Sequence, residues 1–268
     1  MKKISILLLS LFVLAACSSD DDDNIAQPEL TDFDVLVALD KANPANTMGW
    51  DVEEKDLSKW NGVTVKNNRV TSIAVGEEKG VKELPEVISV LTRLDSLIIP
   101  KNRIRRLPVE IGELTSLKKL DLSNNFLTEL PKGFSRLKTN LVYLSISGND
   151  FKVFPKGING FEGLEHLSIS NNELVELPGE IGSLANLKEL FLQGNKLVTL
   201  PKGIGNLLKL EILQMYWNDF KSLPDEMGKL ESLKEIYISG NQDDLFPQSL
   251  EDLINKNQVK VLGVFNRL

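Results

Sequence analysis

Apolar residues recur along most of the chain in units of 23 or 24 residues. Each unit follows the frame L-x-x-L-x-L-x-x-N-x-L-x-x-L-P, which residues 117–131 and 187–201 show in full. The alternation L-x-L predicts a short strand whose leucines are buried and whose intervening residues face solvent. Because one unit cannot bury its apolar face alone, the repetition predicts an elongated stack of strand-and-turn units.

Seven asparagines hold the same place in the frame, just after each predicted strand. The side-chain amide can both donate and accept hydrogen bonds, so it can satisfy backbone groups of the turn that would otherwise be buried unpaired. We therefore expect a ladder of asparagines along the stack. Its rungs are Asn102, Asn125, Asn149, Asn172, Asn195, Asn218 and Asn241.

A proline ends each unit, where it can direct the chain into an extended or loosely helical return on the outer side. The unit before Asn149 carries one extra residue near Thr139 and Asn140, which we expect to form a small outer bulge. The outer part of the core is expected to be filled by isoleucines, namely Ile111, Ile158, Ile181 and Ile204.

With L-P-x-x-I-G-x-L between its strands, the frame resembles the leucine-rich-repeat family over residues 70–268. The resemblance implies an α/β solenoid, a curved superhelix with a parallel β-sheet on its concave side and irregular or 3-10 segments on its convex side. The last units depart from the frame, since Asp243 stands in place of a leucine and Arg267 in place of an asparagine. Such deviation is expected of a terminal repeat with a capping strand, which must face water.

Residues 30–69 do not repeat and are expected to cap the first unit. The sequence predicts a short helix over 31–40 and a hairpin whose turn, Asn67-Asn68, supplies positive φ angles between residues 63–65 and 70–75. This order resembles the cap of extracellular plant leucine-rich-repeat proteins, but the cysteine pair usual there is absent. We therefore expect the cap to rely on packing, with Trp50 and Trp60 in its core rather than in contact with a ligand.

Residues 1–16 are predicted to be a signal peptide. An apolar run over 4–16 follows two lysines, and it is shorter than the roughly 20 residues that cross a bilayer. The run ends in Leu-Ala-Ala-Cys17, which resembles the lipobox of bacterial lipoproteins. The resemblance implies cleavage before Cys17, acylation of Cys17 and a stable membrane anchor of several acyl chains. The alternative is an ordinary secretory signal with a cysteine near its boundary.

Residues 17–29 are predicted to form a flexible tether. Four consecutive aspartates occupy 20–23, and adjacent carboxylates repel one another and stay solvated. The place of this run also resembles the acidic export signal of surface lipoproteins in the Bacteroidetes. That resemblance implies a protein of the outer membrane that faces the medium, whereas a plain spacer or a weak calcium site are the alternatives.

Composition and charge argue against several functions. The net charge is −7 and the only basic cluster is Arg103, Arg105 and Arg106, so the concentrated basic face that nucleic-acid binding needs is missing. With one cysteine and one histidine, neither a disulfide framework nor a cysteine or multi-histidine metal centre is expected. No phosphate loop or paired carboxylates stand out either, and we expect no cofactor, no metal and no catalytic site.

Residues between the buried leucines of each strand are expected to point to the concave surface. In the second half of the chain many of them are aromatic, and exposed aromatic side chains gathered on one face predict a binding site. Two have an alternative role, because Phe265 would seal the end of the solenoid and Trp217 would lean on a neighbouring turn. The predicted site comprises Tyr143, His166, Phe191, Ile212, Tyr216, Trp217, Tyr237 and Phe265.

Together these features predict a non-enzymatic binding module that recognises a protein or peptide on its concave face. Glycan binding by the same aromatic patch is the alternative. A hydrolase built on His166 is disfavoured. Ser145 and Ser168 are expected beside this histidine, but we expect no carboxylate there that could orient it. A passive envelope protein without a ligand is the remaining possibility.

Overall fold

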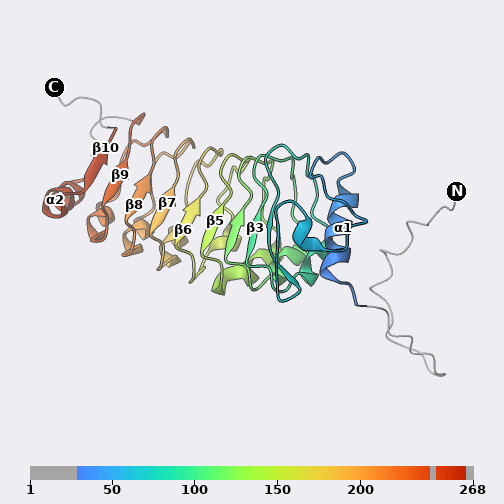
Figure 1. The fold of residues 1–268 in the computed structure, drawn as a ribbon. Coiled ribbons are helices and arrows are strands. Elements are labelled where there is room, and N and C mark those ends of the chain that lie inside the picture. Colours follow the sequence, from blue (N-terminus) through green and yellow to red (C-terminus); the bar gives the residue numbers. More distant parts are fainter. Residues whose placement is uncertain (1–28, 242–245, 264–268) are drawn as a thin grey trace, which may run out of the picture.

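The computed structural model describes residues 29–241 and 246–263, which form an elongated stack of turns along one sheet (Figure 1). The sheet has ten strands in sequence order, of which β1 and β2 are antiparallel and all later pairs parallel. The predicted α/β solenoid with a parallel sheet is confirmed. The strands are β1 (Val63–Lys66), β2 (Arg69–Ala74), β3 (Ser96–Ile98), β4 (Lys119–Asp121), β5 (Tyr143–Ser145), β6 (His166–Ser168), β7 (Glu189–Phe191), β8 (Ile212–Gln214), β9 (Glu235–Tyr237) and β10 (Lys260–Leu262).

Several predicted features lie outside the described residues. They are the signal peptide, the lipidation site Cys17 and the tether up to residue 28, together with Asp243, Phe265 and Arg267.

Short 3-10 helices run between the strands, and η2 to η8 each begin directly after a proline. The prolines have φ between −65° and −74°. Proline fixes φ in this range and lacks the N–H that a helix start leaves unpaired, so it suits this place. The predicted return on the convex side is thus a 3-10 turn. The 3-10 helices between strands are η2 (Glu86–Val90), η3 (Val109–Glu113), η4 (Lys132–Thr139), η5 (Lys156–Ile158), η6 (Gly179–Ser183), η7 (Lys202–Asn206) and η8 (Asp225–Lys229), and η1 (Leu57–Lys59) lies before β1 in the cap.

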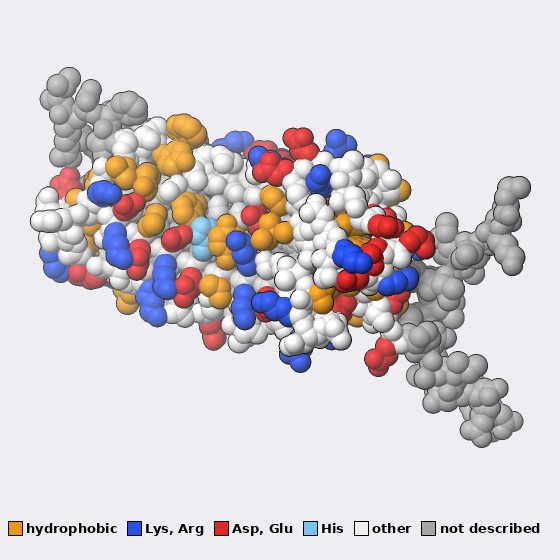
Figure 2. All heavy atoms as spheres, viewed as in Figure 1, with side chains coloured by type: hydrophobic (Ala, Val, Ile, Leu, Met, Phe, Trp, Pro, Cys, Tyr) orange, Lys and Arg blue, Asp and Glu red, His pale blue; other side chains and the backbone are white. Residues whose placement is uncertain are grey.

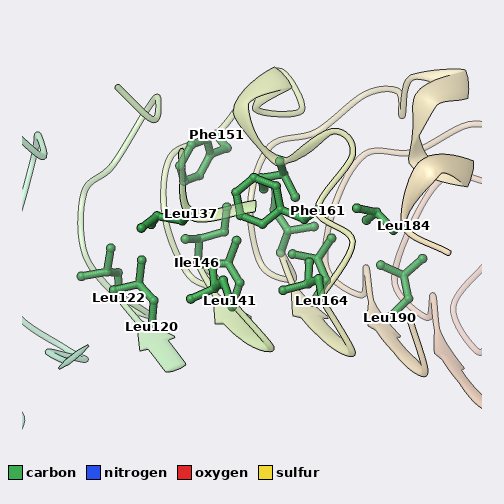
Figure 3. Close-up of a cluster of buried hydrophobic side chains, with 14 of the residues drawn as sticks. Leu120, Leu122, Leu137, Leu141, Ile146, Phe151, Phe161, Leu164, Leu184 and Leu190 are labelled. Carbon is green, nitrogen blue, oxygen red and sulfur yellow. The ribbon is translucent and has the colours of Figure 1, made fainter. Parts of the chain in front are cut away.

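One continuous apolar core fills the space between the sheet and the 3-10 helices (Figure 3). Each fully buried leucine or isoleucine contributes about 1.5–3 kcal/mol relative to an exposed one. The longer unit has its extra residue at the end of η4, which is eight residues long. On this convex side the rings of Phe134 and Phe161 stack with their centroids 5.8 Å apart. The isoleucines predicted to fill the outer core are fully buried, namely Ile111, Ile158, Ile181 and Ile204.

The asparagine ladder joins each turn to the one before it. Asn125 is typical: its Nδ2 donates to the carbonyls of Leu122 in its own turn (3.0 Å) and Ile99 in the preceding turn (2.9 Å). Its Oδ1 accepts from the backbone N–H of Ile104, also in the preceding turn, at 3.0 Å. We expected bonds within the asparagine's own turn, and the structure shows that the ladder also connects neighbouring repeats.

The two tryptophans of the amino-terminal cap pack against each other. Helix α1 (Asp32–Ala42) is capped by Thr31, whose side chain forms a capping box with Asp34. Trp50 and Trp60 are buried, at 9% and 3% exposure, with ring centroids 5.2 Å apart. Both tryptophans are therefore core residues, as expected.

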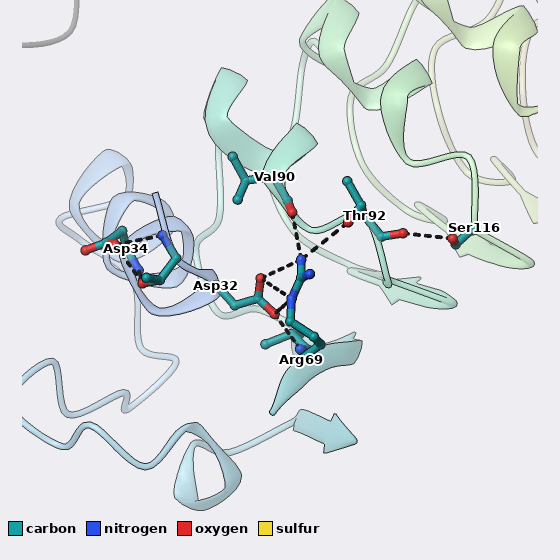
Figure 4. A network of polar contacts seen from close by, with 8 residues as sticks. Asp32, Asp34, Arg69, Val90, Thr92 and Ser116 are labelled. Atoms are coloured by element: carbon teal, nitrogen blue, oxygen red, sulfur yellow. Dashed lines mark hydrogen bonds and ion pairs between the residues drawn. The ribbon is translucent and has the colours of Figure 1, made fainter. Parts of the chain in front are cut away.

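A partly buried ion pair also holds the cap, which the sequence did not predict (Figure 4). The carboxylate of Asp32 is 7% exposed; it lies 3.1 Å from Arg69 Nη2 and accepts from the backbone N–H of Val70 at 2.6 Å. Arg69 Nη2 also donates to the carbonyl of Val90 at 3.1 Å. Asp32 therefore links α1 to the hairpin and, through Arg69, to the first repeat, in a cap without a cysteine pair.

The last repeat departs from the others by carrying an α-helix. Helix α2 (Gln248–Asn257) follows Pro247, packs against η8 and buries Leu250 and Leu253. We expected a deviating repeat and a capping strand, and β10 is that strand, but the helix was not predicted. This ten-residue helix begins directly after a proline, as the 3-10 turns of the other repeats do.

Candidate functional site

Strand register arranges the outward side chains of the sheet in two columns. The first residue of each strand faces the first residue of the next, as Tyr143 faces His166 and His166 faces Glu189. The third residues form the second column, where Ser168 faces Phe191. The middle residues are buried, so chemistry on this face depends on the two columns alone. The hydrophobic side chains on this face gather around His166 and toward the carboxy-terminal strands (Figure 2).

Three predicted site residues form a stack across β5, β6 and β7. The rings of Tyr143 and His166 are nearly parallel, at 11°, with centroids 4.2 Å apart. Phe191 follows at 4.9 Å from His166, tilted by 39°. On the other side, Lys119 Nζ lies 4.8 Å from the centre of the Tyr143 ring, a cation–π contact. We call Lys119, Tyr143, His166 and Phe191 the aromatic stack.

His166 has an acidic partner, contrary to our expectation. Its Nδ1 lies 2.6 Å from Glu189 Oε2, on the neighbouring strand. Glu189 was not among the predicted site residues, although it lies one 23-residue repeat after His166. Because one imidazole nitrogen is held by the carboxylate, the orientation of the ring within the stack is fixed.

The two serines near His166 do not complete a catalytic arrangement. Ser145 and Ser168 are buried, at 4% and 9% exposure, and their hydroxyls lie 3.1 Å and 3.4 Å from those of Ser147 and Ser170. Within the described residues, Glu189 is the only hydrogen-bonding partner of the His166 ring. A nucleophile needs contact with its base, and in the described structure neither serine hydroxyl contacts the His166 ring.

Tyr216 and Trp217 form a second group at the edge of the face. Their rings meet edge to face with centroids 5.1 Å apart, and Trp217 is 65% exposed. We expected Trp217 on a strand, but it lies in the turn after β8 with φ of +53°. Its ring also rests on Gly240 of the next repeat, so the expected alternative contact with a neighbouring turn exists alongside the exposed surface.

The remaining predicted residues are separate from the stack. Ile212 is half-buried at the start of β8. On β9 the hydroxyl of Tyr237 donates to Glu235 at 2.8 Å, and Glu235 pairs with Lys260 at 3.0 Å. The predicted patch is thus divided into the aromatic stack, the Tyr216–Trp217 pair and a polar end at Tyr237.

Both concave tyrosines on strands favour their neutral form. Burial raises the pKa of the Tyr143 hydroxyl above its ordinary value, and the negative charge of Asp121 adds to the effect. The hydrogen bond to Glu235 raises the pKa of Tyr237. Both hydroxyls are therefore neutral hydrogen-bonding groups at physiological pH.

Charged side chains along one margin of the face largely pair with one another. Just before the strands, Lys188 Nζ is 2.8 Å from Glu165 and Lys234 Nζ is 2.6 Å from Glu211, and alternating charges are visible there (Figure 2). Exposed pairs of this kind contribute at most about 1 kcal/mol each. These charged side chains neutralise one another. The aromatic groups are therefore the feature that distinguishes this face from the rest of the surface.

Within the described residues we find no cluster of three or more potential metal ligands. We also find no helix within residues 29–241 and 246–263 that is both long and apolar enough to cross a membrane.

Comparisons with known proteins agree with this architecture. Residues 163–267 match the family model described as a leucine-rich repeat region, and residues 92–151 match that of the leucine rich repeat. No match was found among curated proteins.

Among solved structures, the chain is similar to a leucine-rich-repeat protein of Leptospira interrogans, with 29% identity and a TM-score of 0.54. That match covers 70% of this chain and 59% of the Leptospira chain, so this chain spans less than two thirds of its length.

Two plant proteins share the fold. One is the leucine-rich-repeat ectodomain of the membrane receptor kinase GASSHO1/SCHENGEN3 from Arabidopsis thaliana, in complex with Casparian strip integrity factor 2, with 24% identity and a TM-score of 0.74 over 87% of this chain and 29% of that one. The other is a plant ice-binding protein with 23% identity and a TM-score of 0.68 over 87% of this chain and 78% of that one.

The ten-stranded sheet, the proline-initiated 3-10 turns and the two family matches identify the chain as a leucine-rich-repeat protein. This fold is typically a binding scaffold without enzymatic activity, and it suggests a protein-binding module.

Proposed function

We propose that the protein binds an extended segment of a partner protein or a peptide across the aromatic stack. The observation that carries this proposal is the continuous arrangement of Lys119, Tyr143, His166 and Phe191 on four neighbouring strands. Strands in a sheet are about 4.7–4.9 Å apart, so the stack spans roughly 15 Å. That length suits a short extended segment lying across the strands.

The stack is prepared for binding before a ligand arrives. Stacking of Tyr143 on His166 and the 2.6 Å contact with Glu189 hold the rings in one arrangement. Little side-chain entropy then has to be lost on binding, which is a main cost of association. The half-buried rings retain their edges and the Tyr143 hydroxyl for contact with backbone and side-chain groups of a peptide.

A glycan ligand receives less support from this geometry. Sugars bind to the open faces of aromatic rings, but Tyr143 and His166 cover each other at 4.2 Å. The outer face of Tyr143 is covered by Lys119. The stack therefore presents mainly ring edges, which suit hydrogen-bonding and apolar contacts with a polypeptide.

The binding experiment uses the full chain, purified in a non-ionic detergent, with cross-linking and identification of captured proteins and peptides. Tyr143→Ala combined with Phe191→Ala should abolish capture, and a single cooperative thermal unfolding transition should show that the double variant is still folded. The matched control is Leu208→Ala, which removes an apolar side chain that is 57% exposed and lies outside the strands. Capture that persists in the double variant would show that the stack is not the site.

We also propose that Cys17 anchors the mature chain in the outer membrane, with the solenoid facing the medium. The apolar run, the Leu-Ala-Ala-Cys sequence and the aspartates at 20–23 support this arrangement. Metabolic labelling with a fatty acid should mark the wild-type protein and not Cys17→Ala. Protease added to intact cells should digest the wild-type solenoid, and a protected solenoid would contradict the surface location.

A further inference from the structure

A groove with a volume of about 1260 Å³ lies beside the first repeats, and none of its lining residues belongs to a strand. Its walls are mainly the segments around Pro85 and Pro108, which hold the same place in two successive turns of the solenoid. Lys82 and Arg105 hold the same place in successive turns, 23 residues apart, and the end of α1 at Ala42 closes one side. Arg103 and Arg106 complete a set of four cations.

Among the residues that the structure describes, the arginines in this groove have no carboxylate partner. Most ion pairs of the solenoid join a lysine to a glutamate of an adjacent turn, as in Lys196 with Glu173 at 3.0 Å. In the described part of the chain, no carboxylate oxygen lies within 4.0 Å of the guanidinium nitrogens of Arg103, Arg105 or Arg106. All three are exposed. In a protein of net charge −7, this is a local reversal of charge.

The same groove also offers apolar surface. Phe126 is 41% exposed, and the Arg105 guanidinium lies 5.1 Å from the centre of its ring. Pro85 and Pro108 are half-buried beside it. The groove thus combines an exposed aromatic ring with guanidinium groups that have no carboxylate partner in the described part of the chain.

We propose that this groove is a second binding site, for an acidic segment of a protein partner. Carboxylates of that segment would pair with Arg103, Arg105 and Arg106, because the guanidinium group offers a planar set of donors that matches a carboxylate. An apolar side chain of the same segment packs on Phe126. The site lies on different residues from the aromatic stack and does not depend on it.

Two observations favour a polypeptide over a small anion. A phosphate group has no part that would use Phe126 and the two prolines. The groove also contains Glu83 and Glu86, which repel a compact dianion, whereas an extended segment can place its carboxylates at the arginines and its apolar side chains toward the glutamates. Both features suit a ligand that alternates charged and apolar side chains.

The test uses the full chain in a non-ionic detergent and a rhodamine-labelled synthetic peptide of alternating aspartate and phenylalanine. Fluorescence anisotropy should show binding that weakens as salt is added. The double variant Arg105→Glu, Arg106→Glu should bind the peptide at least about tenfold more weakly. Phe126→Ala, which leaves every charge in place, should also weaken binding.

The matched control is the double variant Lys152→Glu, Lys221→Glu. Both lysines are exposed and hold the place of Arg105 in later turns, and the change in net charge is the same. This variant should bind the peptide like the wild type. An equal loss in both double variants would overturn the proposal, because it would show attraction to the net charge alone.

Three other results would also overturn it. If a peptide with asparagine in place of aspartate bound as tightly as the original peptide, the arginines would not contribute to binding. Displacement of the peptide by inorganic phosphate at the peptide's own concentration would indicate a simple anion site. Tighter peptide binding after replacing the aspartates at 20–23 by asparagine would indicate that the chain's own acidic run fills the groove.

Discussion

The ring of Trp217 lies against Gly240 of the following repeat, where a β-carbon on residue 240 would be only 2.5 Å from Trp217 Cδ1. Both residues occupy the turn position before a ladder asparagine, with φ of +53° and +69°. This left-handed conformation suits glycine and is costly for a bulky residue. The structure therefore keeps a tryptophan, 65% exposed, where the backbone favours a glycine.

Replacing Trp217 by glycine should separate stability from binding. The backbone strain of about 1–3 kcal/mol is removed, which offsets the lost contacts with Tyr216 and Gly240 and the greater freedom of glycine in the unfolded chain. The midpoint of thermal unfolding should therefore stay the same or rise. Capture of the partner should fall if the ligand extends from the stack to this edge. A clear drop in the unfolding midpoint would instead assign Trp217 a mainly structural role.

Asn172→Ala tests the asparagine ladder. Asn172 is buried, donates to the carbonyls of Ile146 and Ile169 and accepts from the N–H of Phe151 at 3.0 Å. Its loss leaves these groups unpaired, which should lower the free energy of unfolding by about 1–3 kcal/mol. Urea unfolding measures the change. The control Asn206→Ala, at an exposed position on the convex side, should change stability by less than about 0.5 kcal/mol.

Asp32→Ala tests the ion pair of the cap. The substitution leaves the buried N–H of Val70 and the half-exposed guanidinium of Arg69 without their carboxylate. We expect a loss of about 2–3 kcal/mol, because a buried donor and a partly desolvated charge become unsatisfied. Hydrogen exchange should increase first in residues 30–75. Uniformly faster exchange over all repeats would contradict a local role for this pair, and Asp150→Ala, at an exposed position, is the control.

The ionisation of Tyr143 provides a test by pH. Burial and the nearby Asp121 raise its pKa in the folded state above the ordinary value of 10.0. The resulting stabilisation is fully present below the pKa of the unfolded chain and is lost as the pH rises through the folded pKa. The absorbance titration of the wild type minus that of Tyr143→Phe should show ionisation above pH 10. Ionisation below pH 10 would mean that the hydroxyl is not buried in the stack.

Much of the fold follows from the repeat in the sequence. The leucine spacing predicted the strands, the prolines predicted the convex returns, and the Asn67–Asn68 pair predicted the hairpin turn. These features succeed because they are local: alternation decides which side of a strand is buried, and proline restricts φ wherever it stands. Helix α2 was missed because it begins after the same kind of proline as the 3-10 turns, and its form depends on packing of Leu250 and Leu253 against η8.

The candidate site was only partly predictable. The sequence by itself determined which residues face outward on the sheet, because side chains alternate along a strand. Only the tertiary structure decided which of them meet. In it Tyr143, His166 and Phe191 form one stack, and His166 contacts the carboxylate of Glu189. Trp217, which was expected on a strand, lies in a strained turn. The physical reason is that such contacts depend on side-chain rotamers and turn geometry between repeats, which a pattern of residue types does not specify.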